Sequence, residues 1–275
     1  MPLLCCFLCN FAKTFLIMSK KYLSDLEVCA VERLSPRHML IKLTHSEPLP
    51  DILPGQFVEV RVENSPETFL RRPISVNYVD RELNQLWLLV AEVGSGTRHL
   101  AELKPGECLD CLYPLGNGFT LPSAADAPVL LIGGGVGTAP LLFLGKQLQD
   151  RSIHPVFLLG GRSAGDILEV ELFRQLGDVF FTTEDGSLGE RGFVTDHSLL
   201  QKNTFSHIYC CGPKPMMMAV ARYANSRGID CEVSLENKMA CGLGACLCCV
   251  EKTVEGNLRV CEDGPVFNVK KLLWK

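Results

Sequence analysis

The sequence lacks an extended run of lysine or arginine, and this absence limits the partners that the chain can have. It contains 27 Lys and Arg against 31 Asp and Glu, which gives a formal net charge of −4 at pH 7. Proteins that bind nucleic acid present clustered basic side chains to the phosphate backbone. We therefore expect no nucleic acid partner.

Histidine is also scarce in this chain. The six histidines stand at positions 38, 45, 99, 154, 197 and 207, with no spacing typical of a metal site or a catalytic triad. The sequence therefore predicts neither a histidine-based metal centre nor a triad hydrolase.

Long apolar runs are absent except at the start of the chain. Residues 1–17, MPLLCCFLCNFAKTFLI, are short for a transmembrane helix and are interrupted by Asn10 and Lys13. As a signal peptide they lack a basic first region and a small-residue cleavage site. Because the polar stretch SKKYLSD follows Met18, we expect translation to start there and residues 1–21 to be an unstructured leader or a misassigned start. A membrane anchor is the alternative, but we expect no membrane association.

Cysteine, in contrast, is abundant, with fourteen residues in a chain of 275. Such a chain is long enough for two domains and a small appendage. Buried free thiols are typical of a reducing compartment, so we expect a cytoplasmic protein. Six of the cysteines stand singly or in adjacent pairs within apolar, strand-like segments: Cys29, Cys108, Cys111, Cys210, Cys211 and Cys231.

Four other cysteines have the ligand spacing of a plant-type 2Fe–2S cluster. The segment CGLGACLCCVEKTV places Cys241, Cys246 and Cys249 at C-x4-C-x2-C, and Cys261 follows after eleven intervening residues. Glycines at 242 and 244 suit a loop that folds over inorganic sulfide, because they allow positive φ and a close approach of backbone N–H groups. The pattern predicts a 2Fe–2S cluster.

The same cysteines could instead bind structural zinc or form disulfides. Structural zinc prefers two well-separated pairs of closely spaced ligands, whereas here three cysteines fall within nine residues. Disulfides are not needed in a large intracellular protein. The adjacent Cys248 would break the spacing as a ligand, so we interpret it as a packed thiol near the cluster.

From Leu26 to about Leu121 the chain alternates apolar and polar residues in short runs separated by Pro and Gly. Six segments have strand period: EVCAVERL, HMLIKLTH, QFVEVRVE, RPISVNYV, QLWLLVAEV and ECLDCLYPL. The only helical pattern among them is TRHLAEL. Residues 22–122 are therefore predicted to form a six-stranded antiparallel β barrel.

Beyond Pro128 strands alternate with helices. Four apolar strand segments, VLLIGG, HPVFLLGGR, DVFFTTED and HIYCCGP, are each followed by a segment with helical character. This alternation predicts an α/β domain with a parallel sheet and right-handed crossovers over residues 123–230, after a small-residue linker at 123–127. Residues 231–275 form the cluster segment, which is too short for an independent globular domain without its metal.

Two turns of the α/β domain have the character of nucleotide-binding loops. GGGVGTAP, Gly133 to Pro140, joins the first strand to the first helix, where backbone N–H groups and the helix N-terminus can meet a pyrophosphate. It lacks the strict G-x-G-x-x-G spacing, and a tight strand-to-helix turn is the alternative. CCGPKPMM, Cys210 to Met217, ends the last parallel strand at the edge where ligands of open α/β sheets bind; a capping turn is its alternative.

Two features of the predicted barrel suggest a second dinucleotide. RRPISV places Arg71, Arg72 and Ser75 on a strand, and GSGT, Gly94 to Thr97, opens the helix TRHLAEL. An Arg guanidinium and a helix N-terminus both suit a phosphate. A solvated Arg pair and an ordinary N-cap threonine would also explain these residues.

Together, RRPISV, GGGVGTAPL, CGPKPMM and ENKMACGLGAC resemble the ferredoxin-reductase superfamily, in which the barrel holds FAD and the second domain holds nicotinamide. With the C-terminal cysteines, the chain resembles the electron-transfer subunits of NAD-dependent, class B dihydroorotate dehydrogenase over about residues 22–270. The resemblance implies the following sites. FAD would contact Arg72, Pro73, Ile74 and Ser75, the backbone of Leu89, Val90 and Ala91, and Gly96 and Thr97; NAD would contact Gly134, Gly135, Val136 and Gly137 with Cys211, Gly212 and Pro213; the cluster would be bound by Cys241, Cys246, Cys249 and Cys261.

The resemblance also implies a function and a partner. The chain would pass electrons from an FMN-containing dihydroorotate dehydrogenase catalytic subunit through the 2Fe–2S cluster and FAD to NAD⁺, in pyrimidine biosynthesis, as a hetero-tetramer of two of each subunit. No residue is placed to deprotonate dihydroorotate, so that oxidation is expected on the partner.

Three alternatives stay open. Arg162, in GGRS after the second parallel strand, could accept the 2′-phosphate of NADP. The partner could be a hydrogenase-type or electron-bifurcating complex. From another class, the chain could be a zinc-bound regulatory module that senses a nucleotide without redox turnover.

Overall fold

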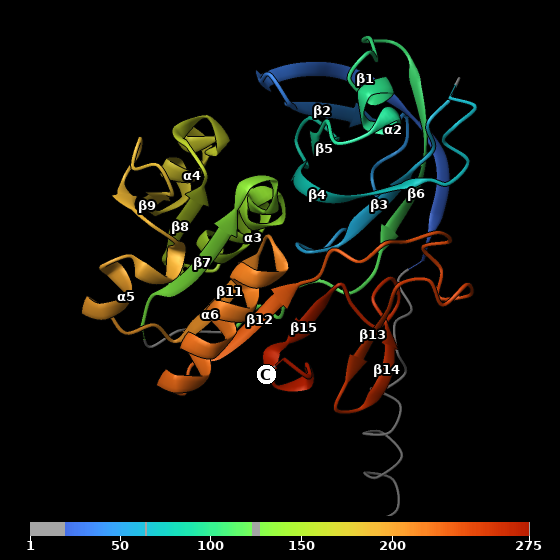
Figure 1. Cartoon of the computed structure of the whole chain (residues 1–275). Helices are drawn as coiled ribbons and strands as arrows, with labels where there is room; N and C mark the ends of the chain where they lie inside the picture. The colour runs from blue at the N-terminus through green and yellow to red at the C-terminus, as the bar shows by residue number, and fades with distance from the viewer. Residues whose placement is uncertain (1–19, 64, 123–126, 275) are drawn as a thin grey trace, which may run out of the picture.

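The computed structural model describes residues 20–63, 65–122 and 127–274 (Figure 1). Residues 1–19 of the expected leader and residues 123–126 of the expected linker lie outside the described residues, whereas Lys20 and Lys21 at the end of that leader are described. No helix of the described part is long and apolar enough to cross a membrane.

Six antiparallel strands close into a barrel, in the order β1-β2-β5-β4-β3-β6, which confirms the predicted barrel. Alternate side chains fill its interior, among them Leu26, Ile41, Val58 and Leu88, all without solvent exposure. A short helix, α2 (Ser95–Leu100), lies between the last two strands. The strands are β1 (Tyr22–Ser35), β2 (His38–Thr44), β3 (Phe57–Val60), β4 (Arg72–Asp80), β5 (Gln85–Ala91) and β6 (Cys108–Leu115).

A seven-stranded sheet follows, in the order β10-β9-β8-β7-β11-β12-β15, and all its neighbours are parallel except β12 and β15. Its central strands are continuously apolar because helices cover both faces. The predicted parallel α/β fold is confirmed. The strands are β7 (Val129–Gly134), β8 (Pro155–Gly161), β9 (Asp178–Thr183), β10 (Glu190–Arg191), β11 (His207–Cys211), β12 (Asp230–Ser234) and β15 (Val266–Asn268).

Two helices cover each face of this sheet. Side chains of α3 (Ala139–Gln149) and α4 (Val170–Leu176) pack with Leu131 and Phe157 on one face. Helices α5 (Leu199–Lys202) and α6 (Lys214–Arg227) lie on the other face (Figure 1), and their side chains pack with it. The helical segment expected after DVFFTTED, in the stretch FVTDHSLL, is shorter than predicted. It forms only a 3₁₀ turn, η4 (Val194–Asp196), before the four-residue α5.

The C-terminal segment is built onto both halves of the molecule. It contains the hairpin β13 (Val250–Thr253) and β14 (Gly256–Arg259), and its β15 extends the parallel sheet. Its Val260, Phe267 and Val269 belong to the same apolar cluster as side chains of α6 and Phe57 of the barrel. This segment therefore obtains its core from its neighbours.

Candidate functional site

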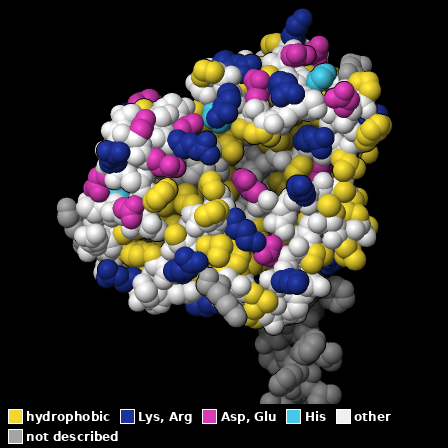
Figure 2. Space-filling view, in the orientation of Figure 1, with side chains coloured by type: hydrophobic (Ala, Val, Ile, Leu, Met, Phe, Trp, Pro, Cys, Tyr) yellow, Lys and Arg dark blue, Asp and Glu magenta, His cyan; other side chains and the backbone are white. Residues whose placement is uncertain are grey.

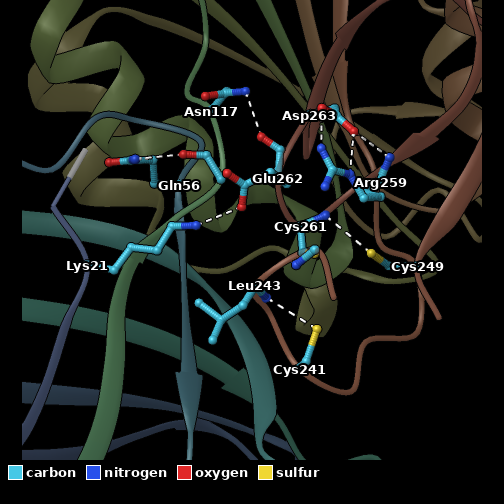
Figure 3. A network of polar contacts seen from close by, with 12 residues as sticks. Lys21, Gln56, Asn117, Cys241, Leu243, Cys249, Arg259, Cys261, Glu262 and Asp263 are labelled. Carbon is cyan, nitrogen blue, oxygen red and sulfur yellow. Dashed lines mark hydrogen bonds and ion pairs between the residues drawn. The ribbon is translucent and has the colours of Figure 1, made fainter. Parts of the chain in front are cut away.

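The loop from Cys241 to Cys249 is shaped by backbone N–H groups that point at sulfur. Leu243 N donates to Cys241 Sγ at 3.4 Å (Figure 3), and Gly244 N donates to Cys261 Sγ at 3.1 Å. Gly242 and Gly244 have φ of 65° and 75°, which glycine adopts without a steric penalty. Such N–H groups suit thiolates, because hydrogen bonds to cluster sulfurs stabilise negative charge there.

The four predicted ligands form two pairs. The thiol of Cys241 lies within hydrogen-bonding reach of that of Cys246, and Cys261 N donates to Cys249 Sγ at 3.4 Å. Among the described residues, no three His, Cys, Asp or Glu side chains converge on one metal position. Two pairs fit a cluster of two irons that are each held by two protein ligands.

The loop makes two of these thiols chemically unequal. Burial opposes ionisation of Cys241, but hydrogen bonds from the N–H groups of Leu243 and Cys246 prevail and lower its pKa to about 6. Burial raises the pKa of Cys261 to about 12. Cys241 is therefore more ready than Cys261 to bind metal as a thiolate. Cys248 is exposed and belongs to neither pair.

Polar contacts fix the cluster segment against the barrel. Lys21 Nζ forms an ion pair with Glu262 Oε2 at 2.7 Å, and Asn117 Nδ2 donates to the Glu262 carbonyl at 3.0 Å (Figure 3). Within the segment, Arg259 pairs with Asp263. These contacts hold the end that carries Cys261 next to the loop that carries Cys241.

Glu59, on β3, lies under the same loop and was missed by the sequence analysis. It is fully buried, and neither carboxyl oxygen has a hydrogen-bond partner within the described structure. Burial raises its pKa to about 7, against the attraction of Arg71. A Cβ added to Gly242 would lie 2.7 Å from Glu59 Cγ. The only sequence signal was a charged residue at an apolar strand position.

A cleft of about 370 Å³ opens beside the barrel and collects most of the residues predicted for FAD. Arg72, Pro73, Ile74 and Ser75 of β4 line it, with Leu89, Ala91 and Thr97. The Val90 side chain packs in the barrel core, and its predicted backbone contact with the flavin stays a prediction. A Cβ on Gly96 would lie 2.9 Å from Arg72 Nε, so this glycine allows the guanidinium to lie against the start of α2.

These residues fit a flavin dinucleotide. The first turn of α2 contains no acidic residue, and no described carboxylate forms an ion pair with Arg72, so its charge is available for a diphosphate. The Thr97 hydroxyl caps α2 instead, accepting hydrogen bonds from Val93 N at 2.9 Å and Gly94 N at 3.1 Å. Its predicted contact with a pyrophosphate would therefore compete with the cap.

A second and larger cleft, of about 940 Å³, lies between the barrel and the parallel sheet. The surface is hollowed between these two halves of the molecule (Figure 2). Gly134, Gly135, Val136 and Gly137 line this cleft together with Gly212 and Pro213, and its volume suits a dinucleotide. It opens at the carboxyl ends of β7 and β11, where ligands of parallel sheets bind.

The two turns that form this cleft touch each other. A Cβ on Gly137 would lie 2.6 Å from Gly212 Cα, so only glycine permits this approach. Gly135 has a φ of 55° and no atom within 4 Å of its Cβ direction, which leaves its backbone open to a ligand. Cys211, predicted to face the crevice, is fully buried and hydrogen-bonded to Ser234.

The two clefts meet. Ala91, Val93, Val136 and Glu236 line both of them, so a flavin in one would face a nicotinamide in the other. Glu236 was not among the site residues predicted from the sequence. It is exposed within the cleft, yet the surrounding protein raises its pKa above that of an ordinary carboxyl group by desolvation.

Comparisons with known proteins agree with this geometry. The family model described as the iron-sulfur cluster binding domain of dihydroorotate dehydrogenase B matches residues 236–273, and that of the oxidoreductase NAD-binding domain matches residues 131–222. A protein of Shouchella clausii named dihydroorotate dehydrogenase B (NAD(+)), electron transfer subunit is 42% identical over 226 residues, which span 80% of this chain and 86% of the relative. This chain belongs to that family.

Other members of the dihydroorotate dehydrogenase B electron transfer subunit family are similarly close. The Fusobacterium nucleatum protein of the same name is 41% identical over 221 residues, 78% of this chain and 84% of its own length. Among solved structures, an NADH-dependent reduced ferredoxin-NADP oxidoreductase has a TM-score of 0.82 and 28% identity over 91% of this chain and 90% of its own. Phthalate dioxygenase reductase, at 21% identity, 79% and 70% coverage and a TM-score of 0.62, shares the fold.

Proposed function

We propose that this chain is the subunit that carries electrons from an FMN-containing dihydroorotate dehydrogenase catalytic subunit to NAD⁺, through a 2Fe–2S cluster and FAD, in pyrimidine biosynthesis. FAD can exchange single electrons with an iron–sulfur cluster and a hydride with nicotinamide, so the two cofactors in series join one-electron to two-electron chemistry. The names of the relatives support a catalytic partner subunit for this chain.

The main support for the proposal is the order of the three candidate sites: the cluster cysteines adjoin the flavin cleft, and the flavin cleft adjoins the larger cleft. Residues 235–239 line the flavin cleft and lead directly to Cys241. Asn237 Nδ2 donates to the carbonyl of Cys249 at 3.3 Å, so this segment also contacts the second pair of thiols. On its other side the flavin cleft shares Val136 and Glu236 with the larger cleft.

The chain's own residues would bind and orient the groups. We propose that Cys241, Cys246, Cys249 and Cys261 hold the irons, that Arg72 and Ser75 bind the flavin, and that the Gly134–Gly137 turn binds the nicotinamide nucleotide. Among the residues that the structure describes near these sites, none is placed as a base toward dihydroorotate, and we propose that its oxidation belongs to the partner. The boundaries at 22, 123 and 231, a cytoplasmic location and a hetero-tetramer of two of each subunit are part of the proposal.

We propose NAD rather than NADP as the acceptor. Arg162 lines the larger cleft, but so do Asp166 and Glu184, and these carboxylates would repel a 2′-phosphate. The relatives' name specifies NAD(+), which supports the same choice.

Co-purification tests the proposal. The chain should be isolated anaerobically together with an FMN-containing barrel protein encoded by the same organism, and the complex should reduce NAD⁺ with dihydroorotate. The chain alone should contain FAD, iron and acid-labile sulfide and should not oxidise dihydroorotate. A colourless protein with one zinc, or dihydroorotate turnover by the isolated chain, would contradict the proposal.

A second candidate function has a specific observation in its favour. The solved structure with 28% identity belongs to a system of flavin-based electron bifurcation. In that case the cofactors would be the same, but a ferredoxin-linked partner would replace the dihydroorotate dehydrogenase. Recovery of such a partner, with no dihydroorotate activity in the complex, would decide for it.

A further inference from the structure

Strand β4 contains a bulge directly after its flavin-cleft residues. Val76 faces Leu88 on β5 and Tyr78 faces Trp87, so Asn77 between them has no partner on that strand. A β-bulge turns a side chain away from its regular direction. The Asn77 side chain is fully buried.

The Asn77 amide links the barrel to two helices of the α/β half. Its Nδ2 donates to the carbonyl of Ala139 at 3.2 Å and to Glu169 Oε2 at 2.9 Å. Both partners are acceptors, so the NH₂ group has to face them. Ala139 begins α3, and Glu169 precedes the first residue of α4.

These hydrogen bonds start and end next to the two clefts. Ser75, two residues before Asn77, lines the flavin cleft, and so does Ala139 itself. Gly137, two residues before Ala139, lines the larger cleft. Consequently, one amide spans from the strand proposed to hold the flavin to the turn proposed to hold the nicotinamide.

The setting of this polar link is apolar and strained. Leu40, Leu89 and Leu168 pack with Ala139 in one buried cluster between the two halves. Glu169 is a non-glycine residue in the left-handed region, with φ of 55°, a conformation that the surrounding structure has to stabilise. Asn77 Oδ1 and Glu169 Oε1 have no hydrogen-bond partner in the described structure, a cost that apolar side chains would avoid.

From this geometry we propose that Asn77, with Glu169, is a positioning residue for hydride transfer. Its amide fixes the flavin-bearing strand β4 on the first turn of α3, and this sets the separation of the flavin from the nicotinamide. The inference rests on the proposed function. A buried polar contact that is retained in an apolar interface is expected to specify one arrangement where apolar packing would permit several.

The test uses the purified, FAD- and cluster-loaded chain. Asn77→Asp keeps the shape of the side chain but replaces the Nδ2 donor by a carboxylate oxygen. That oxygen would face two other acceptors, the Ala139 carbonyl and Glu169 Oε2. Glu169→Gln keeps an acceptor for the Asn77 amide. Glu171→Gln, two residues further along α4 and exposed, is the matched control. The readouts are anaerobic bleaching of the flavin by NADH, the long-wavelength absorption of the flavin–nicotinamide contact, and amide hydrogen exchange in α3 and α4.

Asn77→Asp should slow bleaching about ten- to a hundredfold, because a misplacement of about 1 Å has effects of this size. The NADH dissociation constant should change by less than about threefold, which separates positioning from binding. The long-wavelength absorption should weaken and exchange at the start of α3 should rise. Glu169→Gln and Glu171→Gln should keep all three readouts near those of the unaltered chain.

If FAD-loaded Asn77→Asp shows unchanged flavin bleaching and unchanged amide exchange, this inference is overturned but the proposed function is not. If Asn77→Asp does not retain FAD, the same measurements are made on Glu169→Ala. This variant removes the acceptor from the half-buried end of the link, and unchanged bleaching and exchange in it would likewise overturn the inference. An unaltered chain that carries FAD but is not bleached by NADH would instead overturn the proposed function, and the inference with it.

Discussion

Replacing Gly242 by alanine should weaken the loop that carries Cys241. Gly242 has a φ of 65°, and an added Cβ would lie 2.7 Å from Glu59 Cγ and 3.1 Å from Leu115 Cδ1. Glu59 and Leu115 are fully buried, so neither can move into solvent. The loop would have to shift away from the barrel and take Cys241 with it.

The expected loss has two parts. A left-handed backbone costs a residue with a Cβ about 1–2 kcal/mol, and forcing a methyl group into a packed site costs about 1–3 kcal/mol. Gly256, in the hairpin of the same segment, provides the control. It also has a positive φ, of 103°, but its Cβ direction meets no atom within 4 Å. Gly256→Ala should therefore show only the backbone cost.

Iron and acid-labile sulfide per chain are the direct assay, together with the free energy of unfolding measured in urea. Gly242→Ala should retain less cluster than Gly256→Ala and be less stable than it by about 1–3 kcal/mol, the packing part of the cost. Glu59→Ala removes the Cγ that clashes, so it should partly rescue Gly242→Ala. Full cluster content and equal stability in the two glycine variants would refute the reasoning.

Three further predictions follow from the sites. Cys246→Ser should lose the cluster and its visible absorption, whereas Cys248→Ser should keep both; the reverse result would mean that the pairing of thiols is wrong. Arg72→Ala should weaken FAD binding by about 1.5–3 kcal/mol, the value of a hydrogen bond to a charged group, measured by fluorescence titration with the apoprotein; unchanged affinity would remove Arg72 from the site. Burial raises the pKa of Glu169 to about 7. The hydrogen bond from Asn77 and the charge of Lys42 lower this pKa, whereas the charge of Glu32 raises it further. The folded state therefore binds this proton more tightly than the unfolded state does. The resulting stabilisation of the folded state is present below pH 4.5 and is lost as the pH rises through 7; it is on the order of 3 kcal/mol at most. Urea unfolding of Glu169→Gln should accordingly depend less on pH between 4.5 and 7 than that of the unaltered chain; equal slopes would contradict it.

Much of the architecture was predictable because its signals are local. The alternation of apolar and polar residues that gives β1 to β6, and the apolar strands β7, β8, β9 and β11, depend on neighbouring residues alone. The spacing of Cys241, Cys246 and Cys249 is also local, and it predicted a loop that the structure forms with N–H groups directed at sulfur.

What the sequence could not give depends on contacts between distant segments. The pairing of β15 with β12 joins residues more than thirty positions apart in the chain, for example Val266 with Ser234. Asn77 reads as an ordinary polar residue in a strand, and its partner Glu169 lies 92 residues away. The four-residue α5 shows a different limit of sequence-based prediction. The sequence around it, HSLL, has helical character, but so short a segment does not form a longer helix.

The most direct test of the central claim is electron paramagnetic resonance of the anaerobic chain after addition of NADH. The account predicts that the flavin is bleached and that the signal of a reduced 2Fe–2S cluster appears, and that Cys246→Ser keeps the bleaching but lacks the signal. Bleaching without any cluster signal in the unaltered chain, under conditions where dithionite produces that signal, would contradict an electron path that joins the nicotinamide cleft to the four cysteines.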